Sequence, residues 1–351
     1  MFILIFLNKK KEKKRLRCTL KGLILAAGKG KRMEPLTLKI PKPLLMLPGG
    51  TLIKHQIKAL MDADINEIII VTHHLATKIK QYLEKHLRSH DVKIRIIYQK
   101  TLQGTVSAIL TAEPFLEEKF LVLHCDNFFS CRLKPLIEDF EPPIITLYVE
   151  KTDNKKHDTK TRIVRVQLDG KGFITKIFAS PTKTQKKDFE KGFVTTGAYI
   201  ISKKTIPYLK KTPLTPQGER DISDTLKILI KEKKPVRGTI LNNFGWRENI
   251  NTIDDLLTTN RKILERWKLQ EFIIPNQGTF IKEGITQSFQ ENTTVIGPSW
   301  IGENVRFKNS IIGPFCTIGA HAQVAHSEVK HAIIHPTTTL REVKAFHAYL
   351  F

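Results

Sequence analysis

Cysteine is scarce in this sequence, and the cysteines that are present lack the spacings that bind metal. The 351 residues contain four (Cys18, Cys125, Cys131 and Cys316), and no two of them form a CxxC pair. A disulfide framework or a zinc site would need more cysteines at regular spacings, so neither is expected. Scattered free thiols are typical of a reducing compartment, and we expect a cytoplasmic protein.

Long apolar runs are also missing. Residues 1–7 are apolar, whereas a helix that spans a membrane needs about 20 such residues. A basic run follows at residues 9–17, which is the reverse of the order in a secretory signal. We therefore expect no transmembrane segment, and we interpret residues 1–19 as a basic N-terminal extension with at most weak affinity for a membrane surface.

Acidic residues are few relative to basic ones. The chain has 34 Asp and Glu against 58 Lys and Arg, which gives a net charge of +24. A basic protein is attracted to polyanions, but here the basic residues are spread along the whole chain without an aromatic-interleaved motif. We expect nonspecific attraction to polyanions and no specific nucleic-acid partner.

Apolar runs alternate with amphipathic segments through most of the chain. The pattern predicts strands at 20–26, 67–72, 94–99, 120–125, 144–149, 163–167 and 193–201, and helices at 53–62, 77–87, 105–112, 221–231 and 253–267. This alternation is typical of an α/β fold, a Rossmann-like mostly parallel sheet with flanking helices, which we assign to residues 20–270. Such sheets bind ligands beyond the carboxyl ends of their strands.

The pattern changes near residue 293. Val295, Ile301 and Phe307 stand six residues apart, and Ile312, Ile318 and Val324 repeat this spacing after an offset. A period of six is typical of a stacked β-helix, whereas a helix shows 3.6 and an ordinary strand 2. We predict a short hexapeptide-repeat, left-handed β-helix for residues 271–351, which would cap the first domain or join copies of the chain into a homo-oligomer.

The segment after the first predicted strand carries the strongest chemical signal. It reads Leu25-Ala-Ala-Gly-Lys-Gly-Lys-Arg-Met33, and Pro35-Leu-Thr37 and Pro41-Lys-Pro-Leu44 follow. Glycines let the backbone approach a phosphate and direct N–H groups at it, while Arg32 and Lys42 add positive charge. The glycines alone fit a tight turn with surface cations equally well; the two cations with their flanking prolines favour a phosphate site.

These residues resemble the signature of the sugar nucleotidylyltransferase family, Gly-x-Gly-x-Arg-[Leu/Met]-x-Pro-Leu-Thr followed by Pro-Lys-Pro-Leu. Its first part is most similar to the N-acetylglucosamine-1-phosphate uridylyltransferases, and the rest to enzymes of glucose or mannose phosphates. The resemblance implies a magnesium-dependent transferase that joins a nucleoside triphosphate to a sugar 1-phosphate. It implies that Arg32 and Lys42 are catalytic and that Leu25, Ala26, Ala27, Gly28 and Gly30 bind the nucleotide. Lys31 stands where the family usually has Thr or Ser.

A second motif, Gln99-Lys-Thr-Leu-Gln-Gly-Thr105, matches the family's nucleoside-binding segment. There Gln99 would read the edge of a pyrimidine base, since its amide donates and accepts at once, and Gly104 and Thr105 would pack under the nucleoside. The alternative is a polar turn that begins a helix. The match favours UTP or dTTP as the substrate.

The metal site is expected at Asp126, which ends the segment Val122-Leu-His-Cys-Asp126 and resembles the family's Val-Leu-x-Gly-Asp. A carboxylate at a strand end suits Mg2+, although such an Asp also caps helices. The second ligand depends on how the segment from Trp246 to Thr252 is aligned, which leaves Asn249, Asn251 and, as a third candidate, Glu248.

The sugar-phosphate site matches the family less well. Gly197 and Glu219 lie in segments that resemble the ones lining the sugar, but Ser180 stands where a Lys normally holds the sugar phosphate. Lys176 or Lys183 would have to replace it, and alternation along a strand favours Lys176. We therefore keep two alternatives: a catalytically weakened nucleotide-binding regulatory or assembly homologue, and, less favoured, an acyltransferase built on the β-helix.

Overall fold

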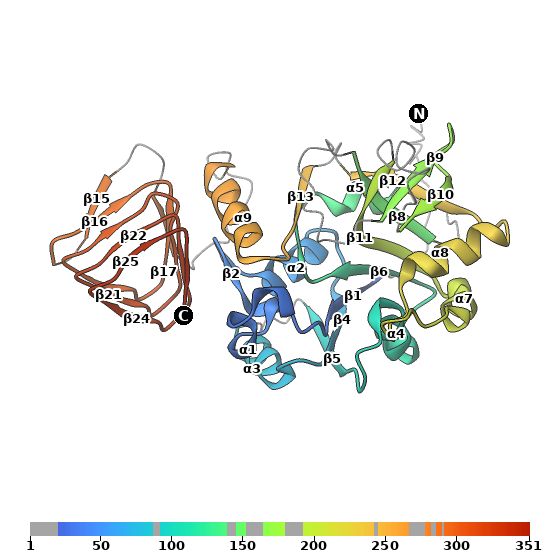
Figure 1. Ribbon diagram of the computed structural model, residues 1–351, viewed down its shortest axis with the longest axis horizontal. Coiled ribbons are helices and arrows are strands. Elements are labelled where there is room, and N and C mark those ends of the chain that lie inside the picture. Colours follow the sequence, from blue (N-terminus) through green and yellow to red (C-terminus); the bar gives the residue numbers. More distant parts are fainter. Residues whose placement is uncertain are drawn as a thin grey trace, which may run out of the picture.

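The computed structural model describes residues 20–86, 92–138, 145–151, 164–179, 192–241, 245–266, 278–281, 286–289 and 291–351. Two bodies lie side by side: a larger one in which helices surround a sheet, and a smaller one built from short stacked strands (Figure 1). The expected N-terminal extension (residues 1–19) and the expected boundary between the domains (residues 270 and 271) lie outside the described residues. No described helix combines the length and apolar character needed to cross a membrane.

Nine described strands form the sheet of the larger body. In sheet order they are β10 (Ile174–Phe178), β9 (Arg165–Leu168), β11 (Phe193–Ser202), β6 (Lys119–His124), β1 (Lys21–Ala26), β4 (Glu67–Thr72) and β5 (Lys93–Tyr98), while β8 (Ile145–Glu150) pairs with β11 and β12 (Val236–Ile240) pairs with β8. The run β6-β1-β4-β5 is parallel, and β11 is antiparallel to β6. The predicted mostly parallel sheet is thus confirmed.

Helices cover both faces of this sheet because successive strand residues point to opposite sides. Leu23 of β1 belongs to the core under α4 (Gly104–Ala112), α7 (Ile206–Lys211) and α8 (Ile222–Lys231). Its neighbour Ile24 belongs to the core under α2 (Leu52–Met61) and α3 (Ala76–His86). Each predicted helix and strand in this body has a counterpart in the structure, with ends that differ by at most two residues wherever both ends are described.

A second, two-stranded sheet stands beside the main one and was not predicted. It pairs β7 (Asn127–Cys131), which follows β6 directly, with β13 (Gly245–Asn249) in antiparallel register. The backbone N–H of Ile250 then donates to the carbonyl of Asp126 at 2.8 Å, which extends the pairing beyond β13. This small sheet brings the segment before α9 (Ile253–Arg266) to the carboxyl end of β6.

The smaller body is a parallel β-helix. One face stacks β14 (Gly278–Ile281), β17 (Ser299–Gly302), β20 (Thr317–Ile318), β23 (Ile333–Ile334) and β26 (Tyr349–Leu350); a second stacks β15 (Thr286–Phe289), β16 (Thr293–Ile296), β19 (Ile311–Ile312), β22 (Glu328–Lys330) and β25 (Lys344–Phe346); and a third stacks β18 (Arg306–Lys308), β21 (Gln323–Ala325) and β24 (Thr339–Arg341). β14 and β15 pair antiparallel with their neighbours, and the other pairs are parallel.

The spacing seen in the sequence is the spacing of this β-helix. Val295 pairs with Ile312, Ile301 with Ile318 and Phe307 with Val324, so equivalent residues of these first turns are 17 apart. In the next turns the spacing is 16, as in the pair Ile318 and Ile334. The offset in the six-residue pattern is the step from Phe307 to Ile312, which has five residues because the chain turns there through a shorter corner. The predicted β-helix is confirmed.

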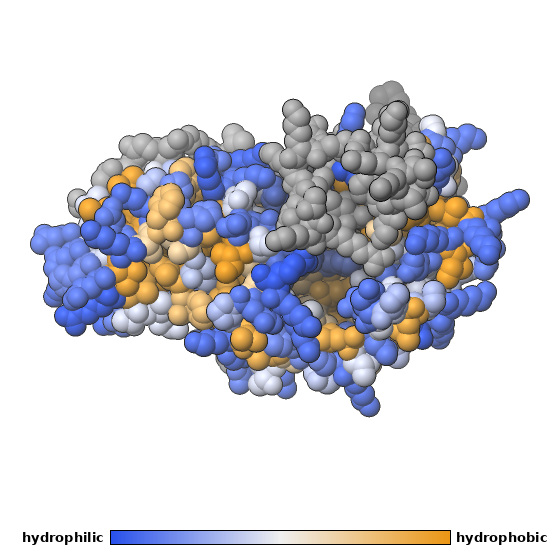
Figure 2. All heavy atoms as spheres, viewed as in Figure 1, coloured by the Kyte–Doolittle hydropathy of each residue, from blue (hydrophilic) through white to orange (hydrophobic). Residues whose placement is uncertain are grey.

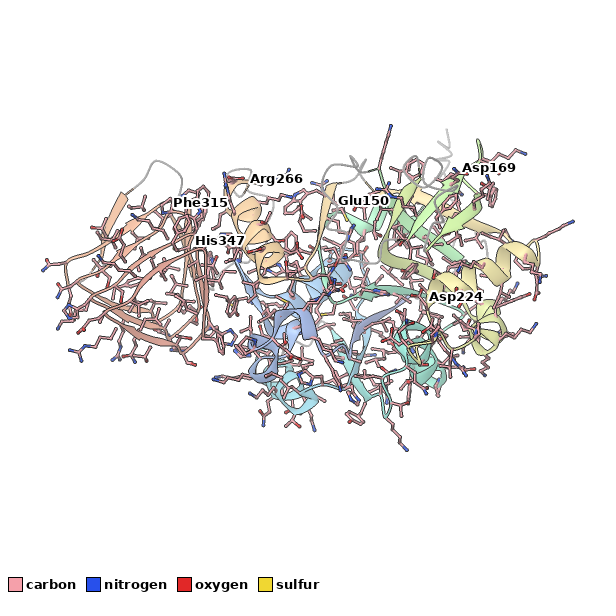
Figure 3. The ribbon with its side chains drawn as sticks, viewed as in Figure 1. Glu150, Asp169, Asp224, Arg266, Phe315 and His347 are labelled. Carbon is pink, nitrogen blue, oxygen red and sulfur yellow. The ribbon has the colours of Figure 1, made fainter. Side chains whose placement is uncertain are left out.

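The β-helix packs against α9 and the loops beyond β1. Trp300, Ile333 and Tyr349 share one buried apolar cluster with Met33, Leu45 and Leu47 of the larger body. Asn260 of α9 accepts from Thr317 Oγ1 at 2.6 Å and donates to the Phe315 carbonyl at 3.0 Å. Phe315 and His347 lie on the edge of the β-helix that faces α9 (Figure 3).

Candidate active site

The glycine loop after β1 is tightly folded yet open toward solvent. Gly30 has φ 68°, and a Cβ there would lie 2.9 Å from Thr37 Cγ2, so a side chain would be strained and crowded. Thr37 Oγ1 donates to the carbonyl of Gly30 at 2.9 Å and closes the loop. A Cβ at Gly28 would meet nothing within 4 Å. The loop therefore leaves its backbone accessible where a phosphate is expected.

This loop forms one wall of a cavity of about 560 Å3 at the carboxyl ends of the parallel strands. The space-filling view is hollowed over this part of the sheet (Figure 2). Thirteen of the residues predicted from sequence line it: Leu25, Ala26, Ala27, Gly28, Gly30, Arg32, Lys42, Gln99, Gly104, Thr105, Asp126, Glu219 and Asn251. Residues as far apart as Leu25 and Asn251 thus meet at one site.

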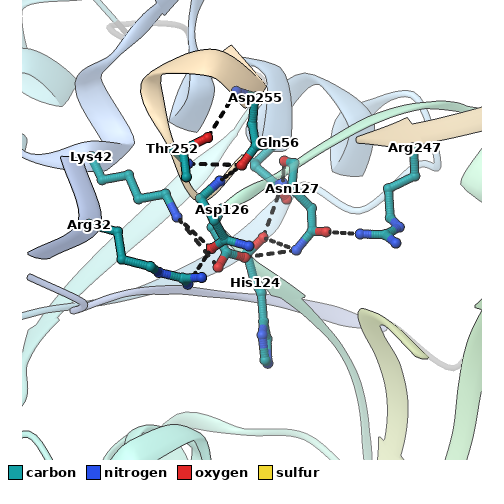
Figure 4. Close-up of polar contacts among 10 residues, drawn as sticks. Arg32, Lys42, Gln56, His124, Asp126, Asn127, Arg247, Thr252 and Asp255 are labelled. Atoms are coloured by element: carbon teal, nitrogen blue, oxygen red, sulfur yellow. Dashed lines mark hydrogen bonds and ion pairs between the residues drawn. The ribbon is translucent and has the colours of Figure 1, made fainter. Parts of the chain in front are cut away.

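Two cations and two oxygen ligands converge at the centre of the site (Figure 4). Lys42 Nζ lies 3.5 Å from Asp126 Oδ2 and 3.5 Å from Asn251 Oδ1. Arg32 donates to the same Asn251 oxygen at 2.7 Å. One carboxylate and one amide oxygen therefore surround a single ammonium group, and the guanidinium lies directly beside them.

Burial and charge act in opposite directions on these groups. Burial lowers the pKa of Lys42 below its ordinary value, and the attraction of Asp126 only partly offsets this effect. Burial alone would raise the pKa of Asp126, but Lys42, His124 and Arg247 together hold it below the ordinary range. Asp126 is therefore ionised at neutral pH, as a metal ligand must be.

Asn251 is fixed in place by the start of α9, whereas Asn249 lies outside the cavity. Asp255 Oδ2 accepts from the backbone N–H groups of Asn251 and Thr252, both at 2.8 Å, and Thr252 Oγ1 accepts from the Asp255 N–H at 3.1 Å. Asn249 ends β13 opposite Asn127, is exposed and lies outside the cavity lining. Glu248, the third candidate, forms an ion pair with Lys262.

At the other end of the cavity, Gln99 is 2% exposed. Its backbone N–H donates to the Thr72 carbonyl at 2.8 Å and its carbonyl contacts His73 Nδ1 at 2.7 Å, but its side-chain Nε2 has no partner among the described residues. Gly104, with φ 83°, lies nearby, and a Cβ there would stand 2.7 Å from the Arg220 carbonyl oxygen. A buried donor without a partner facing a cavity is a group that a ligand would satisfy.

The residues predicted to bind the sugar phosphate do not lie together in the structure. Gly197, at φ 74°, approaches His124 and Asn127 next to Asp126. Glu219 lines the cavity beside Gly104, at the end where the base is predicted. Lys176 lies on the outermost strand β10 and is not among the cavity-lining residues, while Ser180 and Lys183 lie outside the described residues. The replacement of the missing lysine by Lys176 stays a prediction that this cavity does not support.

Sequence reasoning missed two kinds of residue at this site. His124 lines the cavity, packs near the ring of Tyr199 with centroids 5.5 Å apart, and has an Nε2 without a partner among the described residues. It occupies the variable position of the motif that ends in Asp126, so no pattern marks it. Asn127 and Arg247 also contact this centre, but only the pairing of β7 with β13 brings them together.

The chain is similar in sequence to several curated proteins. The bifunctional protein GlmU of Methanocaldococcus jannaschii is 28% identical over 269 residues, which are 75% of this chain and 60% of that protein. The matched part of this chain therefore spans about 60% of the length of that relative. A glucose-1-phosphate thymidylyltransferase of Streptomyces griseus is 24% identical over 344 residues, 94% of this chain and 91% of that one.

Solved structures show the same fold. A Bacillus anthracis protein assigned as a glucose-1-phosphate thymidylyltransferase, in complex with sucrose, aligns with a TM-score of 0.61 at 22% identity and covers 73% of this chain and 98% of its own. A UDP-glucose pyrophosphorylase complexed with UDP-glucose aligns with a TM-score of 0.59 at 20% identity, over 69% of this chain and 97% of its own. Residues 21–266 match the family described as nucleotidyl transferase. Because that match spans well over half of the 351 residues, the chain belongs to the nucleotidyl transferase family.

Proposed function

We propose that this protein is a sugar-1-phosphate nucleotidylyltransferase. A phosphate oxygen of the sugar 1-phosphate attacks the α-phosphorus of a nucleoside triphosphate, a new P–O bond forms, the bond to the β-phosphate oxygen breaks, and pyrophosphate leaves. The observation that carries the proposal is the convergence of the glycine loop, Arg32, Lys42, Asp126 and Gln99 on one cavity. The named functions of the relatives, which act on sugar phosphates, support the same reaction.

The triphosphate is assigned to the glycine loop and the two cations. The accessible backbone at Gly28 suits phosphate oxygens, and Arg32 and Lys42 provide the positive charge that the transferred group requires. No side chain acts as a nucleophile in this reaction. Catalysis therefore depends on holding both substrates in line and on neutralising charge that develops at the α-phosphate.

The residues present fit a magnesium ion. Asp126 Oδ2 and Asn251 Oδ1 both lie 3.5 Å from Lys42 Nζ, so two hard oxygen donors already converge on one cation. Mg2+ commonly takes one or two protein oxygens and fills its other positions with phosphate oxygens and water. Asp126 and Asn251 would hold it, and when bound it would supply charge neutralisation at the phosphates.

The base is assigned to the end of the cavity that contains Gln99, Gly104 and Thr105. The unsatisfied Nε2 of Gln99 can donate to a base carbonyl, and its amide oxygen can accept from a ring N–H, which is the pattern that uracil and thymine present. This favours UTP or dTTP over purine nucleotides. The sugar would then lie toward His124 and Gly197, so that Asp126 stands between the sugar and the base.

A second candidate function is a nucleotide-binding regulatory or assembly homologue with little turnover. The observation that favours it is the position of Lys176 outside the cavity lining, which leaves the predicted replacement for the missing lysine away from the site. A sugar phosphate beside a triphosphate needs opposing cations, because like charges a few Å apart repel by several kcal/mol in a cleft. Self-association through the β-helix is compatible with both functions and does not distinguish them.

The test is pyrophosphate release measured with UTP, dTTP, ATP and GTP, each with Mg2+ and a panel of hexose and N-acetylhexosamine 1-phosphates. Sustained release with a pyrimidine triphosphate that requires a sugar 1-phosphate supports the enzyme. Tight binding of the nucleotide by calorimetry, with no release on any sugar phosphate, would replace it with the regulatory homologue.

A further inference from the structure

Asn127, the residue after the proposed metal ligand, is buried and fully engaged. It is 2% exposed, and its Nδ2 donates to Asp126 Oδ1 at 2.8 Å. Its backbone carbonyl accepts a hydrogen bond from Gln56 Nε2 of α2, which fixes the chain at this turn. One oxygen of Asp126 is thus held by Asn127, while the other, Oδ2, faces Lys42 and the cavity.

Arg247 determines which way the Asn127 amide points. Its NH1 donates to Asn127 Oδ1 at 2.6 Å (Figure 4). An arginine has only donors, so the atom that faces it must be the amide oxygen, and the amide NH2 group must then face Asp126. If the amide were reversed, NH2 would meet the guanidinium and an oxygen would meet the carboxylate, and both contacts would be repulsive.

Arg247 is itself held by Glu150. The guanidinium donates to both carboxylate oxygens, from Nε to Oε2 at 3.3 Å and from NH2 to Oε1. The two side chains are 6% and 11% exposed, so the fork-to-carboxylate geometry is shielded from water. Glu150 ends β8 in the larger body (Figure 3).

These contacts link three elements to the reacting centre. Glu150 comes from the main sheet, Arg247 from β13 and Asn127 from β7, and the same β7–β13 pairing leads directly into Asn251. A continuous series of hydrogen bonds therefore leads from Glu150 through Arg247 and Asn127 to Asp126. Along it, a donor group always faces an acceptor group. The Asn127 amide can satisfy both of its neighbours in only one orientation.

We propose that Arg247 is a positioning residue that acts through Asn127 to fix the carboxylate of Asp126, so that Oδ2 is presented to the divalent cation and Lys42. The proposal rests on the function proposed above. Partners of this kind, outside the metal ligands themselves, commonly change metal affinity by about 10- to 100-fold when they are removed. We expect an effect of this size on binding of the metal and on kcat, with the KM for the nucleotide unchanged.

The variants are Arg247→Lys, Asn127→Ala and the double variant. Arg247→Lys keeps the charge that balances buried Glu150 and removes the planar fork, so the chain should still fold. Arg237→Lys on β12, an arginine that is not at the site, is the matched control for this substitution. Asn127→Ala leaves the Arg247–Glu150 pair in place and removes the amide that links Arg247 to Asp126.

Binding of Mn2+, measured by loss of the electron paramagnetic resonance signal of the free ion, reports the site without turnover. We expect Arg247→Lys and Asn127→Ala each to weaken Mn2+ binding by at least about tenfold, and the double variant to be no weaker than Asn127→Ala. Arg237→Lys should bind as the unmutated protein does. Circular dichroism and thermal unfolding establish that each variant is folded.

Additive losses in the double variant would overturn the proposal, because they would mean that Arg247 does not act through Asn127. Unchanged Mn2+ affinity in folded Arg247→Lys or folded Asn127→Ala would overturn it too, as would an unmutated protein that binds no Mn2+. An unmutated protein that binds Mn2+ and UTP but releases no pyrophosphate contradicts the proposed function alone, and the Mn2+ measurements still decide the role of Arg247.

Discussion

Arg32 and Lys42 are held side by side at the site because both contact the same oxygen, Oδ1 of Asn251. Asn251 accepts from both, and Asp126 Oδ2 forms an ion pair with Lys42. A cation that is held in position before the substrates arrive stabilises developing charge without reorganising. In the proposed reaction these side chains would contribute through their placement as much as through their charge.

We predict that Arg32→Ala and Asp126→Ala each reduce kcat by about 100-fold or more, the scale for loss of one preorganised transition-state contact. Lys39→Ala, at an exposed residue of α1 (Leu36–Lys39), is the control and should keep full activity. Pyrophosphate release at saturating substrates measures the effect. Wild-type rates in both folded site variants would remove the active site from this cavity.

Gln99 gives a prediction about the nucleotide. Its Nε2 is buried without a partner among the described residues, so a pyrimidine carbonyl that accepts from it removes the cost of an unsatisfied donor. We expect UTP and dTTP to bind more tightly than ATP and GTP in calorimetric titrations with Mg2+. In Gln99→Ala this preference should shrink by about tenfold, the scale of one hydrogen bond of about 1.5 kcal/mol. Tighter binding of a purine nucleotide to the unmutated protein would refute the assignment of the base.

At the scale of elements, the sequence predicts what depends on neighbours in the chain. The strand β4 and the helix α8 have the expected bounds to within one residue, because alternation and 3.6-residue spacing are local properties. The pairing of β7 with β13 joins residues about 120 apart in the chain, so no local pattern predicts it. That pairing also places Asn251, and not Asn249, in the cavity lining, which the spacing of motifs left open. Asn127, Arg247 and Glu150 could not be predicted for the same reason.

The first turn of α9 provides an element-scale test. Thr252 caps the helix and Asp255 reaches back to the N–H groups of Asn251 and Thr252, so the cap also orients a proposed metal ligand. We predict that Asp255→Ala lowers the free energy of unfolding by about 1 kcal/mol and also weakens Mn2+ binding. Arg261→Ala, later in the same helix, serves as the comparison for Mn2+ binding. A loss of stability with unchanged Mn2+ affinity would mean that Asp255 stabilises the helix but does not orient Asn251 for metal binding.

For the whole molecule, the sequence predicts the β-helix but not where it packs. Its apolar face covers the segment that carries Lys42, with Tyr349 in the same cluster as Leu45 and Leu47. The backbone N–H of Met46 donates to Tyr349 Oη at 3.2 Å. The β-helix therefore contacts the loop that carries Lys42 directly. A repeat pattern cannot reveal this, because it contains no information about the partner surface.

This contact should make the junction sensitive to acid. Tyr349 Oη accepts from Met46 and lies 2.8 Å from His335 Nδ1, so the hydroxyl proton is directed at a neutral imidazole nitrogen. Burial, aided by the charge of Lys78, lowers the pKa of His335 from 6.5 to about 4. Because the unfolded chain takes up this proton more readily than the folded one, stability contributed here is present above pH 6.5 and is lost as pH falls toward 4.

We predict that lowering the pH from 7 to 5 removes about 2 kcal/mol of stability through His335. Other buried histidines also destabilise the fold in acid, so the informative quantity is the difference between variants. His335→Gln keeps a polar group beside Tyr349 but cannot be protonated, and its thermal unfolding temperature should fall less between pH 7 and pH 5 than that of the unmutated protein. His326→Gln, elsewhere on the β-helix, should behave like the unmutated protein. If the two variants lose the same stability in acid, the hydrogen bond between Tyr349 and His335 does not make the junction pH-sensitive.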